Sequence, residues 1–293
     1  MSEKPSLLTI VIPAYNEAES LPPLLDELLA FCKPRNWKIN LVNDGSKDNS
    51  KQVLESYANN ELLTVIHHKL NKGYGGAIKR GVIACKTEYL ITIDADGQHR
   101  LEDVEKLFQA ILAKDADMIV GSRKGTKAAS LMRGIGKSLI RTIAKILMPV
   151  PIHDINSGMK IYRTDLAKKY IQLCPDTMAY SDIITLCFIN NRHLVLEEPI
   201  TVDARLKGES TIGVHTAFQT VMEIINIVVL FNPMKIFLPI ALLTFLLTLI
   251  WGLPIMLRGI GVSTGTLLGF IASIIFFFLG LIAEQLSQIR RNQ

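Results

Sequence analysis

The stretch YLITIDADGQH, residues 89–99, joins an apolar run to a pair of carboxylates. Short apolar runs rich in β-formers are typical of strands in a covered sheet, so residues 90–93 predict a buried strand. Side chains alternate along a strand, which predicts that Asp94 and Asp96 project to the same side. Two adjacent carboxylates repel each other unless a cation lies between them or one is protonated. The pair fits a metal site or a solvated turn, since Asp-x-Asp-Gly also suits a turn.

Strand-like and helix-like segments alternate through the N-terminal part of the chain. The predicted strands are LLTIVIP, INLVND, LTVIHH, YLITID and ADMIVGSR, separated by segments with apolar residues at helical spacing. This alternation predicts an α/β fold with a doubly wound, mostly parallel sheet, which binds ligands at the carboxyl ends of its strands. Four of these strands run into the polar motifs PAYNE, NDGS, DADGQ and GSRK. Polar ends that share one edge of a sheet favour the metal interpretation of the acidic pair.

The C-terminal part is much more apolar than the rest. The whole chain of 293 residues is 49% hydrophobic, and residues 236–257 and 259–283 carry no charge. A transmembrane helix needs about 20 apolar residues, so we predict two of them, over about residues 236–257 and 264–284. The alternative is a pair of core helices in a soluble domain. Pro239 and Pro254 favour the membrane, where neighbouring groups compensate for a helix proline.

Basic residues near the two spans predict their orientation. Lys235 precedes the first span, Arg290 and Arg291 follow the second, and Arg258 is the basic residue between them. This distribution satisfies the positive-inside rule if both ends of the hairpin are cytoplasmic. The N-terminus lacks the features of a signal peptide. We therefore predict a multi-pass protein of the cell (inner) membrane with a cytoplasmic catalytic domain.

The chain divides into three predicted parts. Residues 1–212 are expected to form the α/β domain, residues 213–233 an amphipathic juxtamembrane helix, and residues 234–293 the two spans with a short cytoplasmic tail. The amphipathic pattern suits the membrane interface, although a helix packed on the soluble domain explains it almost as well. The net charge of +5 is compatible with a nearby anionic lipid surface, and we expect no nucleic-acid partner.

A glycine-rich segment, NKGYGGAIKRG at residues 71–81, matches neither the P-loop nor the dinucleotide fingerprint. Its glycines would permit a helix N-terminus to face an anion. Glycines needed for tight packing between helix and sheet are an equally good interpretation. Both remain open at the level of sequence.

Six motifs, in this order, resemble the family-2 glycosyltransferases with a GT-A fold: IVIPAYNEAESL, VNDGSKDNS, NKGYGGA, DADGQH, GSR and INSGMKIYR. The chain is most similar to the membrane-bound polyprenyl-phosphate glycosyltransferases of the dolichyl-phosphate mannose synthase and bactoprenol glucosyltransferase type. The resemblance covers about residues 7–212, and the C-terminal hairpin resembles the bactoprenol type. It implies transfer of a hexose-type sugar, with inversion, from a UDP- or GDP-sugar to an undecaprenyl or dolichyl monophosphate at the cytoplasmic membrane face.

The resemblance also implies which residues contact the nucleotide sugar. They follow the predicted strands or lie in a basic loop before the hairpin: Pro13, Tyr15, Glu17, Asp44, Gly73, Asp94, Ala95, Arg205 and Lys207. Asp44 would receive the base, although Asp44-Gly45 is also an ordinary turn. Arg205 and Lys207 would close over the diphosphate and limit hydrolysis.

The metal, acceptor and catalytic residues are implied in the same way. Asp94, Asp96 and Gln98 would hold Mg²⁺ or Mn²⁺ against the diphosphate, with His99 outside the ligand set because hard cations prefer oxygen. The acceptor phosphate would be held by Arg123, Arg133 and Ser157, and the catalytic residues would be Asp154, Asp96 and Arg123.

Asp154 matches the position usually assigned as the base. A phosphate monoester has a second pKa of about 6, so the acceptor needs little deprotonation, and Asp154 could orient it instead.

Three other hypotheses remain. A processive polysaccharide synthase would show QxxRW before further spans, whereas only QIRRN is present. A nucleotidyltransferase would place a phosphate loop near the first strand. A membrane scaffold could keep the fold without activity. A homo-oligomer is also possible if Gly252, Gly265, Gly269 and Gly280 allow close contact between copies.

Overall fold

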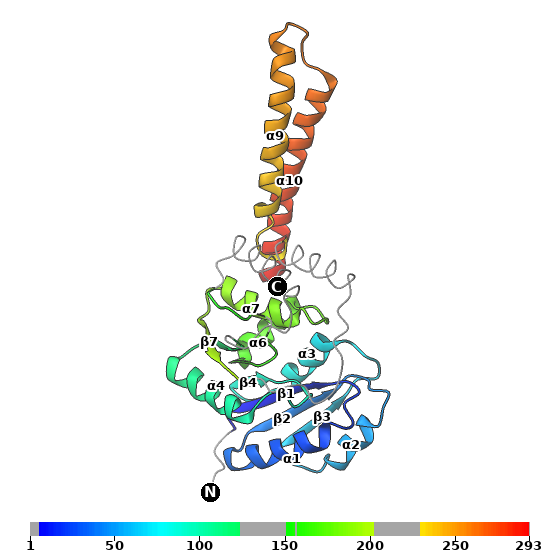
Figure 1. Ribbon diagram of the computed structural model, residues 1–293, viewed down its shortest axis with the longest axis vertical. Coiled ribbons are helices and arrows are strands. Elements are labelled where there is room, and N and C mark those ends of the chain that lie inside the picture. The colour runs from blue at the N-terminus through cyan, green and yellow to red at the C-terminus, as the bar shows by residue number, and fades with distance from the viewer. Residues whose placement is uncertain (1–5, 124–150, 156, 202–228, 293) are drawn as a thin grey trace. The chain divides into compact units, whose positions relative to one another are not determined.

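The computed structural model describes residues 6–123, 151–155, 157–201 and 229–292 (Figure 1). The described residues form two compact units, one with residues 6–123, 151–155 and 157–201 and the other with residues 229–292. Arg133, Arg205 and Lys207 lie outside the described residues, as does most of the predicted amphipathic helix at 213–233.

A seven-stranded sheet forms the centre of the first unit. Its strands lie in the order β3 (Leu63–His67), β2 (Lys38–Asn43), β1 (Leu8–Ala14), β4 (Tyr89–Thr92), β6 (Lys160–Arg163), β5 (Met118–Ser122) and β7 (Val195–Pro199). Four of the described pairings are parallel, and the two made by β6 are antiparallel. The predicted α/β fold with a doubly wound, mostly parallel sheet is therefore confirmed. The five predicted strands are present, while β6 and β7 were not predicted.

Helices cover both faces of the sheet (Figure 1). On one face lie α1 (Leu21–Cys32), α2 (Ser50–Ser56) and α4 (Leu101–Lys114), whose apolar sides share a buried cluster with Ile10 and Ile39. The other face carries α3 (Tyr74–Ala84), α6 (Thr164–Tyr170) and α7 (Tyr180–Asn190). Short 3₁₀ helices, η1 (Lys33–Arg35) and η2 (Ile171–Leu173), extend α1 and α6. The alternation of side chains along each strand allows the sheet to bury both faces at once.

The direction of β6 decides what reaches the carboxyl edge of the sheet. Thr92 of β4 and Val120 of β5 both pair with Lys160, the first residue of β6. Because β6 runs antiparallel to both neighbours, its amino end lies where β4 and β5 end. The described residues before β6, Asp154, Ile155, Ser157 and Gly158, therefore reach the same edge as the residues that follow β4 and β5.

The second unit contains α9 (Met234–Leu257) and α10 (Thr264–Asn292). Both helices are long and apolar enough to cross a membrane, which agrees with the predicted two-helix hairpin. The second helix continues beyond the predicted end at residue 284. The two helices pack directly on each other, and Ser273 Oγ on α10 donates a hydrogen bond to the carbonyl oxygen of Ala241 on α9 at 3.0 Å.

Glycines make this close packing possible. A Cβ at Gly252 would lie 2.3 Å from Cγ2 of Thr266, and a Cβ at Gly269 would lie 2.2 Å from Oγ1 of Thr248. A Cβ at Gly280 would lie 2.7 Å from the Cβ of Phe237. Three of the four glycines considered for contacts between copies are thus used inside the hairpin. Their presence gives no support to a homo-oligomer.

Candidate active site

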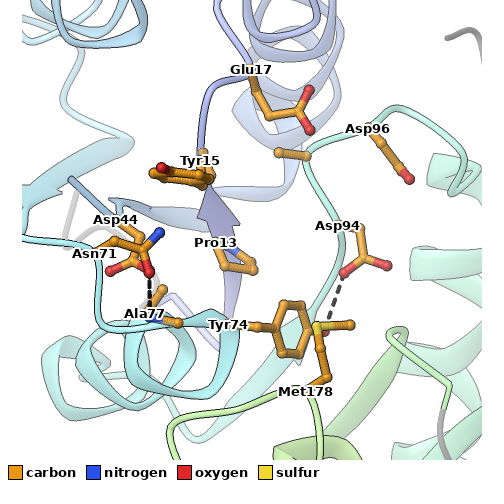
Figure 2. A pocket seen from close by; sticks show the side chains of 13 residues that line it. Pro13, Tyr15, Glu17, Asp44, Asn71, Tyr74, Ala77, Asp94, Asp96 and Met178 are labelled. Carbon is orange, nitrogen blue, oxygen red and sulfur yellow. Dashed lines mark hydrogen bonds between the residues drawn. The ribbon is translucent and has the colours of Figure 1, made fainter. Parts of the chain in front are cut away.

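A cavity of about 340 Å³ lies at the carboxyl ends of β1, β2 and β4 (Figure 2). Its lining residues come from the ends of these strands, from the start of α3 and from the segment before α7: Pro13, Ala14, Tyr15, Glu17, Asp44, Asn71, Gly73, Tyr74, Ala77, Asp94, Ala95, Asp96 and Met178. Eight of these residues were predicted for the nucleotide sugar or the metal: Pro13, Tyr15, Glu17, Asp44, Gly73, Asp94, Ala95 and Asp96. The structure brings them together around one space.

The turn after β1 presents Tyr15 to the cavity. Asn16 has a φ of 56°, a left-handed conformation that asparagine tolerates better than most residues. Its backbone N–H donates to Ser46 Oγ at 3.0 Å, and the backbone N–H of Glu17 donates to Ser50 Oγ at 3.1 Å. These bonds connect the turn to the segment after β2. Tyr15 remains 40% exposed at the cavity wall, where its ring is available for stacking.

Asp44, at the end of β2, is buried and heavily hydrogen-bonded. Its Oδ1 accepts from His68 Nδ1 at 2.7 Å and from the backbone N–H of Lys72 at 2.9 Å. Its Oδ2 accepts from the backbone N–H of Gly73 at 2.8 Å. A carboxylate has about four acceptor positions, so roughly one is left, on Oδ2. The ordinary-turn interpretation of Asp44 is insufficient, since this carboxylate holds the segment between β3 and α3.

The acidic pair lies just beyond β4. The strand ends at Thr92, so a turn rather than strand alternation brings Asp94 and Asp96 to the same cavity. Tyr74 Oη donates to Asp94 Oδ1 at 3.1 Å (Figure 2). The backbone N–H of Asp94 donates to His99 Nδ1 at 3.2 Å. Burial raises the pKa of Asp94; His99 opposes this rise, and Asp96 adds to it.

Gly158 determines how much space the Asp94 carboxylate has. A Cβ on this glycine would lie 2.5 Å from Asp94 Oδ2, closer than any ordinary contact. The carbonyl oxygen of Gly158 also accepts from Thr92 Oγ1 at 2.7 Å, which ties the residue to the end of β4. The turn before β6 therefore forms one side of the acidic site.

The donor set of this site fits a hard divalent cation. Asp94 and Asp96 supply carboxylate oxygens to one cavity, and Mg²⁺ in nucleotide sites typically uses one or two carboxylates together with phosphate oxygens. Gln98 does not line the cavity, although its backbone N–H donates to Asp96 Oδ1 at 3.2 Å. His99 Nδ1 accepts from the backbone N–H of Asp94, and its position outside the ligand set stays a prediction.

The glycines of the glycine-rich segment pack closely against other parts of the protein, and Gly73 also lines the cavity. A Cβ at Gly75 would lie 2.3 Å from the carbonyl oxygen of Pro175, and one at Gly73 would lie 2.5 Å from that of Asp176. The same Asp176 oxygen accepts from the backbone N–H of Gly76 at 3.2 Å, and Lys79 forms an ion pair with its carboxylate. A Cβ at Gly81 would lie 2.4 Å from Cγ1 of Val11 on β1, which is the predicted contact between helix and sheet. The packing interpretation is therefore supported, with a helix-to-loop contact in addition to the helix-to-sheet contact. This packing also brings Met178 to the cavity.

Arg123 and Asp154 form an ion pair next to the acidic site. Arg123 Nε donates to Asp154 Oδ2 at 2.7 Å, and Nη2 donates to Oδ1 at 2.8 Å. The backbone N–H of Arg123 adds a third bond to Oδ2 at 3.1 Å. Burial acts to raise the pKa of Asp154, but the hydrogen bonds and charge of Arg123 outweigh it, and the pKa lies below its ordinary value. Such a carboxylate is a weak base.

Ser157, which was predicted for the acceptor phosphate, is buried. It is 1% exposed, and its hydroxyl donates to the carbonyl oxygen of Met159 at 3.3 Å. Its side chain is therefore not exposed to solvent, and its role at the acceptor phosphate stays a prediction. Sequence reasoning also missed Ala14, Asn71, Tyr74, Ala77 and Met178. Tyr74 lies within the glycine-rich motif and could have been found there, whereas nothing in the sequence singled out Met178.

Comparison with known proteins agrees with this architecture. Residues 9–171 match the family described as Glycosyl transferase family 2, and residues 232–289 match the GtrB C-terminal hairpin. The chain belongs to glycosyl transferase family 2.

Curated relatives include three proteins that act on polyprenyl phosphates by name. The chain is 30% identical, over 55% of its length and 52% of the relative's, to a dolichyl-phosphate beta-glucosyltransferase of Trichomonas vaginalis. It is 24% identical, over 75% of its own length and 66% of the relative's, to the dodecaprenyl-phosphate galacturonate synthase of Rhizobium johnstonii. It is 32% identical, over 64% and 57%, to the undecaprenyl-phosphate 4-deoxy-4-formamido-L-arabinose transferase of Proteus mirabilis. The matched regions thus span about half to two thirds of these relatives.

Solved structures share the fold. Glucosyl-3-phosphoglycerate synthase from Mycobacterium tuberculosis, in complex with Mg²⁺ and UDP, aligns with a TM-score of 0.59 at 14% identity, over 76% of this chain and 79% of that one. S. aureus TarS 1–349, in complex with UDP, aligns with a TM-score of 0.55 at 19% identity, over 77% and 66%. At these identities the likeness concerns the fold alone, and it supports the GT-A-like assignment.

Proposed function

We propose that this protein transfers a sugar from a nucleotide diphosphate sugar to a polyisoprenyl monophosphate at a membrane. The observation that carries the proposal is the cavity that Asp44, Asp94 and Asp96 share, in a chain that also carries a hairpin suited to a membrane. A family-2 domain supplies the donor chemistry. The names of the relatives make a polyprenyl phosphate the acceptor that best fits the hairpin.

Asp44 favours a nucleobase that donates a single N–H hydrogen bond to its carboxylate. Its Oδ1 already accepts two hydrogen bonds and its Oδ2 accepts one, so about one acceptor position remains. Uracil offers one ring N–H, whereas guanine offers a ring N–H and an adjacent amino group that together need both oxygens. We therefore propose UDP rather than GDP as the nucleotide, with Tyr15 stacking on the base.

Asp94 and Asp96 would hold Mg²⁺ or Mn²⁺. The bound cation would neutralise charge that develops on the leaving diphosphate. Tyr74 keeps its hydrogen, because burial and then the charge of Asp94 raise the pKa of its hydroxyl, and it holds the Asp94 carboxylate in place.

The acceptor phosphate is its own nucleophile. With a second pKa of about 6 it is largely a dianion at neutral pH, so the lowered pKa of Asp154 is no obstacle. One phosphate oxygen forms a bond to the anomeric carbon while the bond from that carbon to the diphosphate breaks on the opposite face, with inversion. In this proposal Asp154 holds Arg123, and Arg123 attracts the acceptor phosphate. Arg133, Arg205 and Lys207 remain predictions for the phosphates.

The location follows from the hairpin. Two membrane helices would keep the cavity near the bilayer surface, where a soluble donor and a lipid acceptor must meet, and positioning of this kind is a large part of catalysis. We propose that the catalytic domain is cytoplasmic, as the flanking basic residues suggest.

A donor screen tests the proposal. The full chain in detergent receives undecaprenyl phosphate, Mg²⁺ or Mn²⁺, and a panel of labelled UDP- and GDP-sugars. We expect label in the organic phase with a UDP-sugar, and more than a hundredfold less with Asp96→Asn, since the change removes a charged group that acts in the transition state. Asp165→Asn, which alters an exposed carboxylate on α6, is the matched control. Lipid labelling that survives Asp96→Asn would contradict the assigned role of the acidic pair.

A further inference from the structure

The first residue of β6, Lys160, is a buried lysine beside the site. It is only 1% exposed, and it pairs with Thr92 of β4 and Val120 of β5. Its position places it between β4, which Asp94 follows, and β5, which Arg123 follows. No step of the proposed reaction uses this side chain.

All three N–H groups of its ammonium have acceptors. Nζ donates to the carbonyl oxygen of Ile155 at 2.6 Å, to Thr185 Oγ1 at 2.8 Å, and to the carbonyl oxygen of Ser181. Thr185 Oγ1 itself donates to the Ser181 carbonyl, so its oxygen is free to accept from Lys160. Three acceptors around one nitrogen require the charged form. Burial lowers the pKa of Lys160 to about 8, which still leaves the ammonium form in the majority at neutral pH.

Packing alone does not account for a lysine here. Burying an ammonium costs several kcal/mol even in favourable surroundings, whereas a methionine would fill the same space without that cost. What methionine lacks is the ability to hold backbone carbonyls. The structural explanation for Lys160 must therefore lie in the segments that it joins.

These segments are the two that flank the site. Ile155 directly follows Asp154, whose carboxylate accepts all three bonds from Arg123. Ser181 and Thr185 lie on α7, just after the segment that brings Met178 to the cavity. Ser181 Oγ adds a bond to the carbonyl oxygen of Ser157 at 3.4 Å, so the turn before β6 is attached to α7 at two points.

We propose that Lys160 is a positioning residue, which holds the turn that carries Asp154 against α7 and so sets the place of the Arg123–Asp154 pair relative to the donor cavity. This inference rests on the proposed function. Lys160 acts mainly on the acceptor side, because its partner Ile155 adjoins Asp154 directly, whereas the same turn meets the donor side only at Gly158, beside Asp94. Its loss should impair transfer to the lipid more than binding of the donor.

The test compares Lys160→Met with wild type in the full chain. We expect kcat for transfer to undecaprenyl phosphate to fall about ten- to a hundredfold, as for a misplaced reacting group. The KM for the UDP-sugar should stay within about twofold, since donor binding is not altered. Hydrolysis of the donor by water should persist, because it does not use the acceptor site. Lys168→Met is the matched control, since Lys168 also donates to a backbone carbonyl, that of Cys85, away from the cavity.

Thr185→Val is the second variant, in case Lys160→Met does not fold. It removes one of the three acceptors and should give a smaller loss in kcat with the same unchanged KM. If lipid transfer, donor hydrolysis and thermal stability all fall together in the folded variant, Lys160 is only a structural residue and the inference is wrong. Equal activity of Lys160→Met and wild type also overturns it. A wild type that transfers sugar to no lipid overturns the proposed function and this inference together.

Discussion

At the residue scale, the site depends on the hydrogen-bond partners of its three carboxylates. Asp44 accepts hydrogen bonds from backbone N–H groups and His68, and Asp94 accepts one from the hydroxyl of Tyr74. Asp154 accepts its bonds from Arg123. Asp44 and Asp94 were predictable from sequence because strand ends in a parallel sheet converge, whereas Asp154 was identified only through the family resemblance. The hydrogen bonds that distinguish their roles were not predictable. They join residues between 20 and 31 positions apart in the chain.

Gly158→Ala tests the acidic site at this scale. The new methyl group would lie 2.5 Å from Asp94 Oδ2, so the carboxylate must move away from its position beside Asp96. We expect Mn²⁺-dependent binding of UDP, measured by calorimetry, to weaken at least about tenfold, which corresponds to about 1.4 kcal/mol. Gly265→Ala is the control, since a Cβ there meets nothing closer than 3.9 Å. Unchanged affinity in Gly158→Ala would show that the Asp94 carboxylate is not a ligand.

At the element scale, α3 shows how one sequence pattern supports two structures. The glycines at its start are compatible with an anion site, yet here they admit the backbone of residues 175–177. A segment about a hundred residues later in the sequence packs against these glycines, and no local sequence pattern predicts that contact. The same contact brings Met178 to the cavity, so this packing also shapes the donor site.

Gly75→Ala tests this contact. Its Cβ would lie 2.3 Å from the carbonyl oxygen of Pro175, and backbone cannot give way as a side chain can. We expect the free energy of unfolding to fall by about 1–3 kcal/mol, as in other overpacked sites. Thermal melting of the detergent-solubilised protein measures the change. Ile83→Ala alters a half-exposed residue of the same helix and should change stability by less than about 0.5 kcal/mol. Equal melting temperatures for Gly75→Ala and wild type would refute the tight contact.

At the scale of the whole molecule, the four cysteines make the membrane orientation testable. Cys32, Cys85, Cys174 and Cys187 are all buried, so a maleimide that cannot cross membranes should react little with the native protein. Val262, between the two membrane helices, is 58% exposed. In intact cells we expect Val262→Cys to be labelled and Lys51→Cys, an exposed position on α2, to be labelled only after lysis. Labelling of Lys51→Cys in intact cells would reverse the proposed orientation.

The sequence by itself determined the features that depend on local spacing and composition. The five N-terminal strands, the apolar hairpin and the carboxylates after β1, β2 and β4 follow from alternation, hydropathy and the geometry of parallel sheets. Only the tertiary structure decided the antiparallel insertion of β6 between β4 and β5, because a short strand gives no local signal of its direction. That insertion brings Asp154, Gly158 and Lys160 to the carboxyl edge. The tertiary structure also decided that the glycines of α3 and of the hairpin serve internal packing. A glycine permits close approach only where the fold places another segment opposite it.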